Sequence, residues 1–441
     1  MSARRLHRRL AWIAGAVALA WAATGFLHPI MSWTAPRAAV QAPPPHDAPL
    51  DGVIAPGPSL AAAGLEDVTF VRLMPTPGGA AWLAEDAAGR RIAVDARTGA
   101  PAGEAERAHA VTLARHYSGL EETPIAEAVR VESFSTRYPS VNRILPIWEV
   151  RLDTPDGLTV YVDTKTDRLA TVTNDQRRIL LSVFQNVHTL KFLEGVEVVR
   201  IVAMLALVGG VLATTALGLA MLATGRGRGV RGAHRALAWV TAPLVIGFAA
   251  SGLFHLVVTS SLSAPPAPKA GSFPTADLAG LPRVTVAGRI DLTATRGGEG
   301  RAVWRVAGAD GGLYFDGAGR LLALDDAARA RQIAGRDGPV RTVKSFDDEY
   351  GFINKRLPVI GVGQGPGAVF ADVREGLVAG RAAPGVAGVE GWVFDVIHKW
   401  EPVAGWIGRR NRDYLTMLAV ALIGVMALLG LALATRRSPR N

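Results

Sequence analysis

The chain has 441 residues, of which 49% are hydrophobic and only 20% are charged, a balance typical of a membrane protein rather than a soluble enzyme. It contains no cysteine, which excludes disulfides, iron–sulfur clusters, thiolate zinc sites and covalently attached haem. The net charge of +10 comes with arginine clusters beside apolar segments, so it indicates membrane topology, and we expect no nucleic-acid partner.

Four apolar segments are each about 20 residues long, which is the length needed to cross a bilayer core. In chain order they cover residues 10–30, 201–223, 236–259 and 414–435. The first follows an arginine-rich start, as a signal peptide does. Its apolar run is longer than a signal peptide's and no clear cleavage site follows it, so we expect a retained span.

Arginine-rich segments at 1–9, 225–235 and 436–441 lie beside the ends of these spans. The positive-inside rule puts all three in the cytoplasm, so the long segments 31–200 and 260–413 are predicted to lie outside. The high alanine, arginine and glycine content favours a bacterial source. We therefore expect a bacterial inner-membrane protein in contact with the bilayer, with cytoplasmic termini and large periplasmic domains.

Three pairs of segments share a sequence pattern. HRRLAWIAGAVALAWAATGFLH (7–28) matches HRALAWVTAPLVIGFAASGLFH (234–255), and SVFQNVH (182–188) matches WVFDVIH (392–398). VESFSTRYPSVNRILPIWEV (131–150) also matches VKSFDDEYGFINKRLPVIGV (343–362). This pattern predicts a tandem, parallel repeat with two spans per half, and a pseudo-two-fold four-helix bundle in the membrane.

The segments between the spans predict small α+β modules, about two per half. Turn signals between alternating apolar residues indicate hairpins at 80–101, 145–172 and 302–324, and a degraded fourth hairpin ending near Asp372. Helices are predicted at 103–119 and 325–335. The expected domains are a tail and first span (1–35), a first periplasmic region (36–178), an interfacial segment and second span (179–224), a cytoplasmic loop and third span (225–259), a second periplasmic region (260–390), and an interfacial segment with the fourth span and tail (391–441).

Six of the nine histidines fall in matched pairs, which are His7 with His234, His28 with His255, and His188 with His398. Ionisable side chains at membrane depth are costly and rare unless functional, and imidazole is a common axial ligand of haem iron. Twenty-one residues of helix separate His7 from His28, a rise of about 31 Å, so the two lie at opposite edges of the bilayer.

His188 and His398 lie in stretches whose apolar spacing predicts helices on the outer membrane surface. They would then meet His28 and His255 at the periplasmic face, where four histidines suffice for two bis-imidazole haems. Gly25 and Gly252 would let a flat macrocycle approach the backbone, or they serve ordinary helix packing. His7 and His234 either bind a further haem or are interfacial polar side chains.

Other polar residues have two readings each. Arg409, Arg410 and Arg412 either pair with haem propionates or an anionic iron chelate, or contact lipid headgroups. Tyr138 and Tyr350 either contact substrate or maintain a shared turn. His46, His109 and His116 are predicted to be solvated.

The pattern W-x-V…Y-V-D-x-x-T, at Trp148 and 161–166, resembles the PepSY domain, and the spans with LHRRLAW…TGFLH resemble the PepSY-associated transmembrane family. The resemblance covers nearly the whole chain except the proline-rich linker 36–49, and it departs at Asp167, where the turn usually has glycine. Characterised members of that family are haem-b-containing inner-membrane reductases of ferric siderophores. The resemblance therefore implies haem b, a ferric siderophore in the periplasm, and electrons from quinol or a separate donor protein.

Two other functions fit the sequence. The chain is either a non-redox binding or regulatory membrane protein whose PepSY modules act on a periplasmic peptidase, or a transporter or metal-handling protein that binds iron or copper directly. The sequence has no H-E-x-x-H, G-x-S-x-G or Walker A motif, so we expect no catalytic residue beyond the haem.

Overall fold

The computed structural model describes residues 3–45, 47–139, 142–222, 227–261, 269–284, 289–308, 311–347, 349–351, 356–382 and 386–435. Its contacts divide the chain into two compact units. The membrane unit comprises Met1–Ala35, Gln176–Pro265 and Pro384–Asn441, and the sheet unit comprises Pro36–Asp175 and Pro266–Ala383. Each unit therefore combines segments from both halves of the chain.

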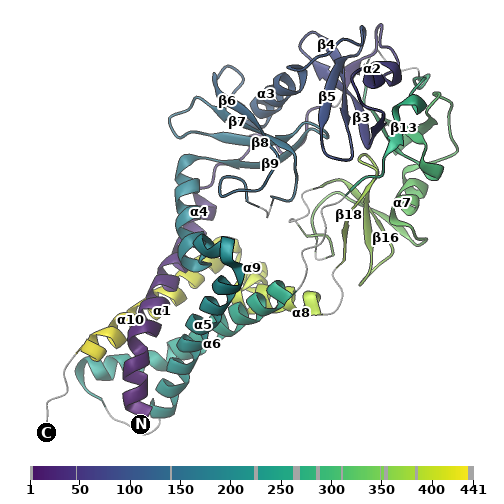
Figure 1. The fold of residues 1–441 in the computed structure, drawn as a ribbon. Helices are drawn as coiled ribbons and strands as arrows, with labels where there is room; N and C mark the ends of the chain where they lie inside the picture. Colours follow the sequence, from purple (N-terminus) through teal and green to yellow (C-terminus); the bar gives the residue numbers. More distant parts are fainter. Residues whose placement is uncertain are drawn as a thin grey trace. The chain divides into compact units, whose positions relative to one another are not determined.

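Within the described residues, four helices are long and apolar enough to cross a membrane, which confirms the four predicted spans. They are α1 (Ala3–Trp33), α5 (Glu197–Leu222), α6 (Gly229–Ser261) and α10 (Arg409–Thr435). Figure 1 shows these helices together as a bundle. Each of α1 and α6 packs against both α5 and α10, which places α1 and α6 at opposite corners of the bundle.

Shorter helices flank the spans where interfacial segments are expected. These are α4 (Asp175–His188), a 3-10 turn (Lys191–Val196), α8 (Val386–Val393), a π-helical turn (Phe394–His398) and α9 (Glu401–Ile407). Ile179 of α4 and Trp392 and Trp406 of the second segment are strongly exposed. Apolar and tryptophan side chains left exposed on short helices are typical of segments that lie in a membrane interface.

Hairpins from both halves share one six-stranded sheet in the sheet unit. Its order is β14-β13-β12-β3-β4-β5, and β3 pairs antiparallel with β12. Trp82 of β4 and Trp304 of β13 are fully buried with ring centroids 5.6 Å apart, and they form the centre of its core. The strands are β3 (Phe70–Thr76), β4 (Gly79–Glu85), β5 (Arg91–Asp95), β12 (Leu292–Arg296), β13 (Ala302–Gly308) and β14 (Gly311–Asp316).

Two four-stranded antiparallel sheets complete the predicted α+β modules, each with a helix against it. The hairpin ending near Asp372, which we expected to be degraded, belongs to a four-stranded sheet whose pairing shifts register at Phe370 and Ala371. The first sheet has β6 (Ile125–Val131), β7 (Ile147–Leu152), β8 (Thr159–Asp163) and β9 (Arg168–Thr173) with α3 (Ala105–Ser118). The second has β15 (Val340–Val343), β16 (Val359–Val362), β17 (Val369–Asp372) and β18 (Leu377–Arg381) with α7 (Asp326–Ala334).

Short elements connect these sheets. They are β1 (Ala48–Pro49), which pairs with β11 (Arg289–Ile290), β2 (Asp67–Val68), which pairs with β10 (Phe273–Pro274), the helix α2 (Gly57–Ala62), and 3-10 turns at Thr275–Asp277 and Gly298–Gly300.

Asp167, in the turn after β8, holds two buried side chains. Asp167 has a φ of 57°, a left-handed conformation that normally favours glycine. Its carboxylate receives hydrogen bonds from both terminal nitrogens of Arg72, at 2.5 and 3.0 Å, and contacts Nε2 of His109 at 2.7 Å. The Asp167 carboxylate therefore pairs with two buried side chains, and both would lose this partner if the residue were glycine.

The prediction that His109 is solvated is wrong. Its side chain is 4% exposed, because the face of α3 that carries it packs onto the sheet and the Asp167 carboxylate is there to pair with it. His116 lies nearer the surface, with Nε2 3.0 Å from the Ala42 carbonyl oxygen, and His46 lies outside the described residues.

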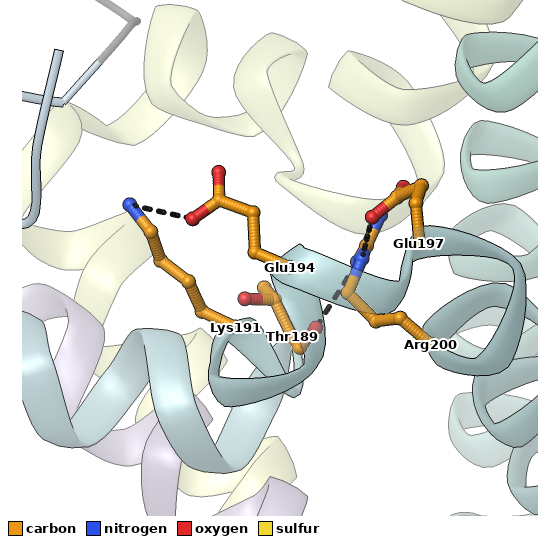
Figure 2. A pocket seen from close by; sticks show the side chains of 5 residues that line it. All are labelled: Thr189, Lys191, Glu194, Glu197 and Arg200. Atoms are coloured by element: carbon orange, nitrogen blue, oxygen red, sulfur yellow. Dashed lines mark hydrogen bonds and ion pairs between the residues drawn. The ribbon is translucent and has the colours of Figure 1, made fainter.

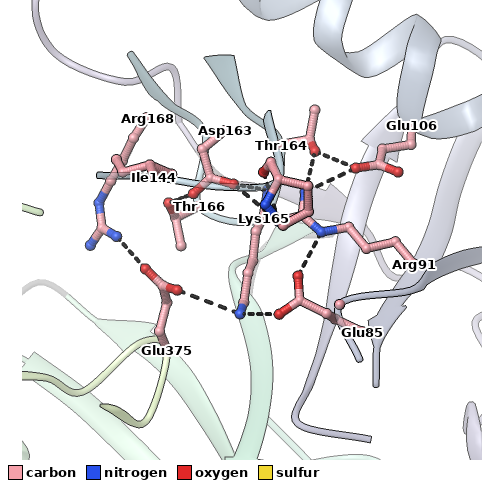
Figure 3. Close-up of polar contacts among 12 residues, drawn as sticks. Glu85, Arg91, Glu106, Ile144, Asp163, Thr164, Lys165, Thr166, Arg168 and Glu375 are labelled. Atoms are coloured by element: carbon pink, nitrogen blue, oxygen red, sulfur yellow. Dashed lines mark hydrogen bonds and ion pairs between the residues drawn. The ribbon is translucent and has the colours of Figure 1, made fainter. Parts of the chain in front are cut away.

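A buried ion network joins the three sheets of the sheet unit (Figure 3). Lys165 donates to Glu85 at 2.7 Å and lies 3.5 Å from Glu375, while Arg168 donates to Glu375 and Asp372 at 2.6 Å each. Glu85 ends β4 and Asp372 ends β17, Arg168 begins β9, and Lys165 and Glu375 lie in the turns after β8 and β17. Because the ions are buried, each depends on its partners to offset the cost of desolvation.

The network predicts a defined acid sensitivity. Burial acts to raise the pKa of Glu85, but Lys165 and Arg91 outweigh it and lower this pKa to about 2. At pH values above the ordinary pKa of a glutamate, the ionised carboxylate therefore contributes about 3 kcal/mol to the free energy of unfolding. This contribution is lost as the pH falls toward 2. Glu85→Gln should destabilise the sheet unit at pH 7, and the difference from wild type should shrink between about pH 4.5 and 2.

Urea-dependent proteolysis of the full chain in detergent, repeated across this pH range, measures that difference. A Glu85→Gln variant that is as stable as wild type at pH 7 would contradict the assignment. Glu104→Gln is the control, because the Glu104 side chain is 86% exposed and should contribute little.

Candidate functional site

All six matched histidines lie in the membrane unit. His7 and His28 come from α1, and His234 and His255 from the diagonally placed α6. His188 ends α4, and His398 ends the π-helical turn that follows α8. The two short interfacial elements therefore carry the histidines that the transmembrane helices do not.

At one end of the bundle the histidines form two matched aromatic arrays. The Phe184 ring lies beside both His28 and His188, with centroids 5.5 and 4.7 Å away. In the same way, the Phe394 ring lies 4.1 Å from His255 and 4.6 Å from His398. The spacing F-x-x-x-H in both interfacial segments places each phenylalanine one helical turn before its histidine.

Hydroxyl groups on the spans orient the two interfacial histidines. Nδ1 of His188 lies 2.9 Å from Oγ1 of Thr24, which itself donates to the Ala20 carbonyl at 3.0 Å. Because that hydroxyl proton is already committed, the oxygen accepts from Nδ1–H, and the neutral ring keeps its lone pair on Nε2.

The second interfacial histidine has the same arrangement. Nδ1 of His398 lies 3.1 Å from Oγ of Ser251, whose hydroxyl donates to the Gly247 carbonyl at 2.6 Å. It also lies 3.2 Å from the Phe248 carbonyl oxygen, which can only accept. Gly25 and Gly252 were predicted from the sequence as site residues, whereas the hydroxyls of Thr24 and Ser251 before them were not.

His7 and His234 have matched surroundings at the other end of the bundle. Nδ1 of His7 donates to the Thr214 carbonyl oxygen at 2.9 Å. Nδ1 of His234 is buried without a hydrogen bond of normal geometry, although the Met426 carbonyl is within range. A Cβ atom built on Gly218 or Gly430 would lie 3.3 Å from Cε1 of His7 or His234, respectively.

Both of these glycines belong to an L-G-L-A sequence, at 217–220 and 429–432, which is a repeat signal that the sequence analysis missed. The absence of a side chain at each glycine leaves room for an imidazole between two helices. This matched packing favours a specific role for His7 and His234 over that of ordinary polar residues at a helix end.

The two interfacial histidines are held in the neutral form. Burial lowers the pKa of His188 to about 4, with further contributions from His398 and His28. Burial also lowers the pKa of His398 to about 4, although its contact with the Phe248 carbonyl opposes this. A neutral imidazole is the form that binds a metal, so both rings are ready to act as ligands at neutral pH.

The donor set fits a haem better than a bare metal ion. Among the described residues, no hydrogen bond uses Nε2 of any of the six histidines. The same part of the chain holds no group of three or more His, Asp or Glu side chains close enough to share one ion. A porphyrin supplies four nitrogen ligands itself, so two histidines at each haem are enough.

The glycines beside His28 and His255 differ from each other. A Cβ atom on Gly252 would lie 3.5 Å from Cε1 of His398, whereas one on Gly25 would lie 3.4 Å from the Val420 side chain. Gly252 therefore makes room for a histidine, and Gly25 serves the packing of α1 against α10.

The three arginines at the start of α10 also differ. Arg412 is buried and donates to Glu401 at 2.9 Å and to the Lys399 carbonyl at 2.8 Å, so it ties α10 to the second interfacial segment. Arg409 and Arg410 are exposed, and the Arg410 guanidinium lies 5.8 Å from the centre of the Trp33 ring. These two remain available to an anion.

The structure favours the turn role for the two tyrosines. Tyr138 and Tyr350 are fully buried, and each phenol donates at 3.0 Å to a carbonyl in its own loop, that of Ile144 or Arg356. Neither hydroxyl is exposed to a substrate. The nearby Asn354 and Lys355 lie outside the described residues.

A hollow lies beside the 3-10 turn that follows α4. It is lined by Thr189, Lys191, Glu194, Glu197 and Arg200 (Figure 2). Its charges pair with one another, since Arg200 contacts Glu197 at 2.5 Å and Lys191 lies 3.8 Å from Glu194. These internal pairs neutralise the hollow, so it offers no excess charge for a ligand.

No family model, no curated protein and no solved structure matches this chain.

Proposed function

We propose that this protein is a b-type haem protein of the bacterial inner membrane that passes electrons to a periplasmic acceptor. The observation that supports this proposal most directly is the orientation of the histidine rings. His7, His188 and His398 direct Nδ1 to an oxygen atom and leave Nε2 free, at both ends of one helical bundle. Hydrogen bonds to the nitrogen that does not bind the metal fix the tautomer and ring orientation of metal-binding histidines.

The proposal includes haem at both edges of the membrane. His7 and His234 would hold one haem, and His28, His188, His255 and His398 would hold haem at the opposite edge. When bound, haem supplies one-electron transfer. The protein's part is to orient the imidazoles, and the Phe184 and Phe394 rings beside them would keep water from the ligands.

The proposal also includes a tandem duplication with the sheet unit in the periplasm. Matched contacts support the duplication, since His188 with Thr24 and His398 with Ser251 are equivalent pairs. The arginine-rich segments beside the spans support the orientation. The PepSY resemblance supports a ferric siderophore as the acceptor, with quinol or a separate protein as the donor.

The first experiment is the dithionite-reduced minus oxidised optical spectrum of the full chain, expressed with a haem supply and purified in detergent. We expect sharp α and Soret bands of six-coordinate b-type haem, and reoxidation when a ferric siderophore is added to the reduced protein. A protein that stays colourless with added haemin would reject the proposal.

Gly218→Leu should weaken haem binding at the His7 end by at least about 10-fold, because the new side chain would occupy the space of the His7 ring. Gly209→Leu is the matched control on the same helix, since a Cβ atom there meets nothing within 4 Å. Equal haem content in the two variants would contradict the role assigned to His7.

A further inference from the structure

The surroundings of His255 and His28 differ at a polar contact. A carboxylate oxygen of Glu390, on α8, lies within hydrogen-bond distance of Nδ1 of His255. The Glu390 side chain is only 12% exposed, so its charge lies close to the ring with little solvent between them. No described carboxylate makes such a contact with His28 in the other half.

The sequence accounts for this difference. Glu390 lies four residues before Phe394, and the residue four before Phe184 is Leu180. At this matched position, α8 therefore carries a carboxylate and α4 carries an apolar side chain. The His28 and His255 rings otherwise have the same neighbour, a phenylalanine from the interfacial segment.

We propose that Glu390 is a positioning residue that lowers the reduction potential of the haem bound through His255. This inference rests on the proposed haem function. A carboxylate that accepts the Nδ1 proton gives the ring imidazolate character and makes Nε2 a stronger donor. The added negative charge favours Fe(III) over Fe(II), so the ligand environments of His255 and His28 are unequal.

The test is a potentiometric titration of the purified full chain followed by its optical bands. Glu390→Gln keeps the shape of the side chain and removes its charge, and Glu390→Leu copies the matched position. At a fixed ambient potential, each variant should raise the ratio of reduced to oxidised haem about 10-fold, equivalent to ~59 mV for a one-electron couple.

Glu194→Gln is the control, because its side chain is 68% exposed and lies 3.8 Å from Lys191 in a surface ion pair, so the midpoints should not change. Variants with wild-type haem content and wild-type midpoints would overturn the role of Glu390 and leave the haem function intact. Loss of haem from both variants would also overturn it, because Glu390 would then be needed for binding alone. A wild-type protein without haem bands rejects the underlying function instead.

Discussion

Replacing His188 or His398 with alanine should abolish binding of the haem that the replaced histidine ligates. Each ring is held by a hydroxyl on a neighbouring span, is neutral, and leaves Nε2 free to bind iron. Alanine removes this ligand. The measurement is haem per protein together with the reduced-minus-oxidised spectrum. We expect bands of haem at the opposite edge to persist, because His7 and His234 are untouched.

Three further variants sharpen this test. Thr24→Val removes the hydroxyl that orients His188 but not the ligand, so it should weaken haem binding by about 10- to 100-fold rather than abolish it. Ser251→Ala should have a smaller effect at His398, because the Phe248 carbonyl still accepts its Nδ1 proton. His116→Ala is the control, since His116 belongs to the sheet unit. Unchanged haem content and spectrum in both histidine variants would rule out these ligands.

Sequence patterns were sufficient to predict the four spans, because apolar length is a local property of the chain. The hydroxyls of Thr24 and Ser251 and the glycines of the L-G-L-A sequences were not identified as histidine partners. Their role depends on which face of one helix meets another, and a single sequence does not contain that information. The repeat pattern did contain a signal, since each partner recurs in the second half.

In the sheet unit, the sequence could not predict which strands pair across the two halves of the chain. Turn residues predicted the hairpins, but not the pairing of β3 with β12 across the two halves, which depends on contacts more than 200 residues apart. The error at His109 has the same origin. Its burial depends on the Asp167 carboxylate, which lies 58 positions along the chain and stands at a turn where the pattern favours glycine.

Arg168→Met should destabilise the sheet unit by about 3–5 kcal/mol, because it leaves buried carboxylates without their main cation. Arg168 donates at 2.6 Å to Asp372 and to Glu375, and its side chain is 8% exposed. Methionine fills much of the same volume, so the loss reflects charge rather than a cavity. Urea-dependent proteolysis of the full chain in detergent measures it, and the haem spectrum should stay unchanged because the network lies outside the membrane unit.

The effect should depend on the network and not on arginine itself. Arg90→Met removes an arginine from an exposed pair with Asp86, where the Arg90 side chain is 56% exposed, and should cost less than about 1 kcal/mol. Adding Asp372→Asn to Arg168→Met should recover part of the loss, because one uncompensated buried charge disappears. Recovery should be incomplete, because Glu375 has lost its contact with Arg168 in both cases and keeps Arg356 at 3.0 Å. Equal losses for Arg168→Met and Arg90→Met would show that the three sheets do not depend on these buried ions.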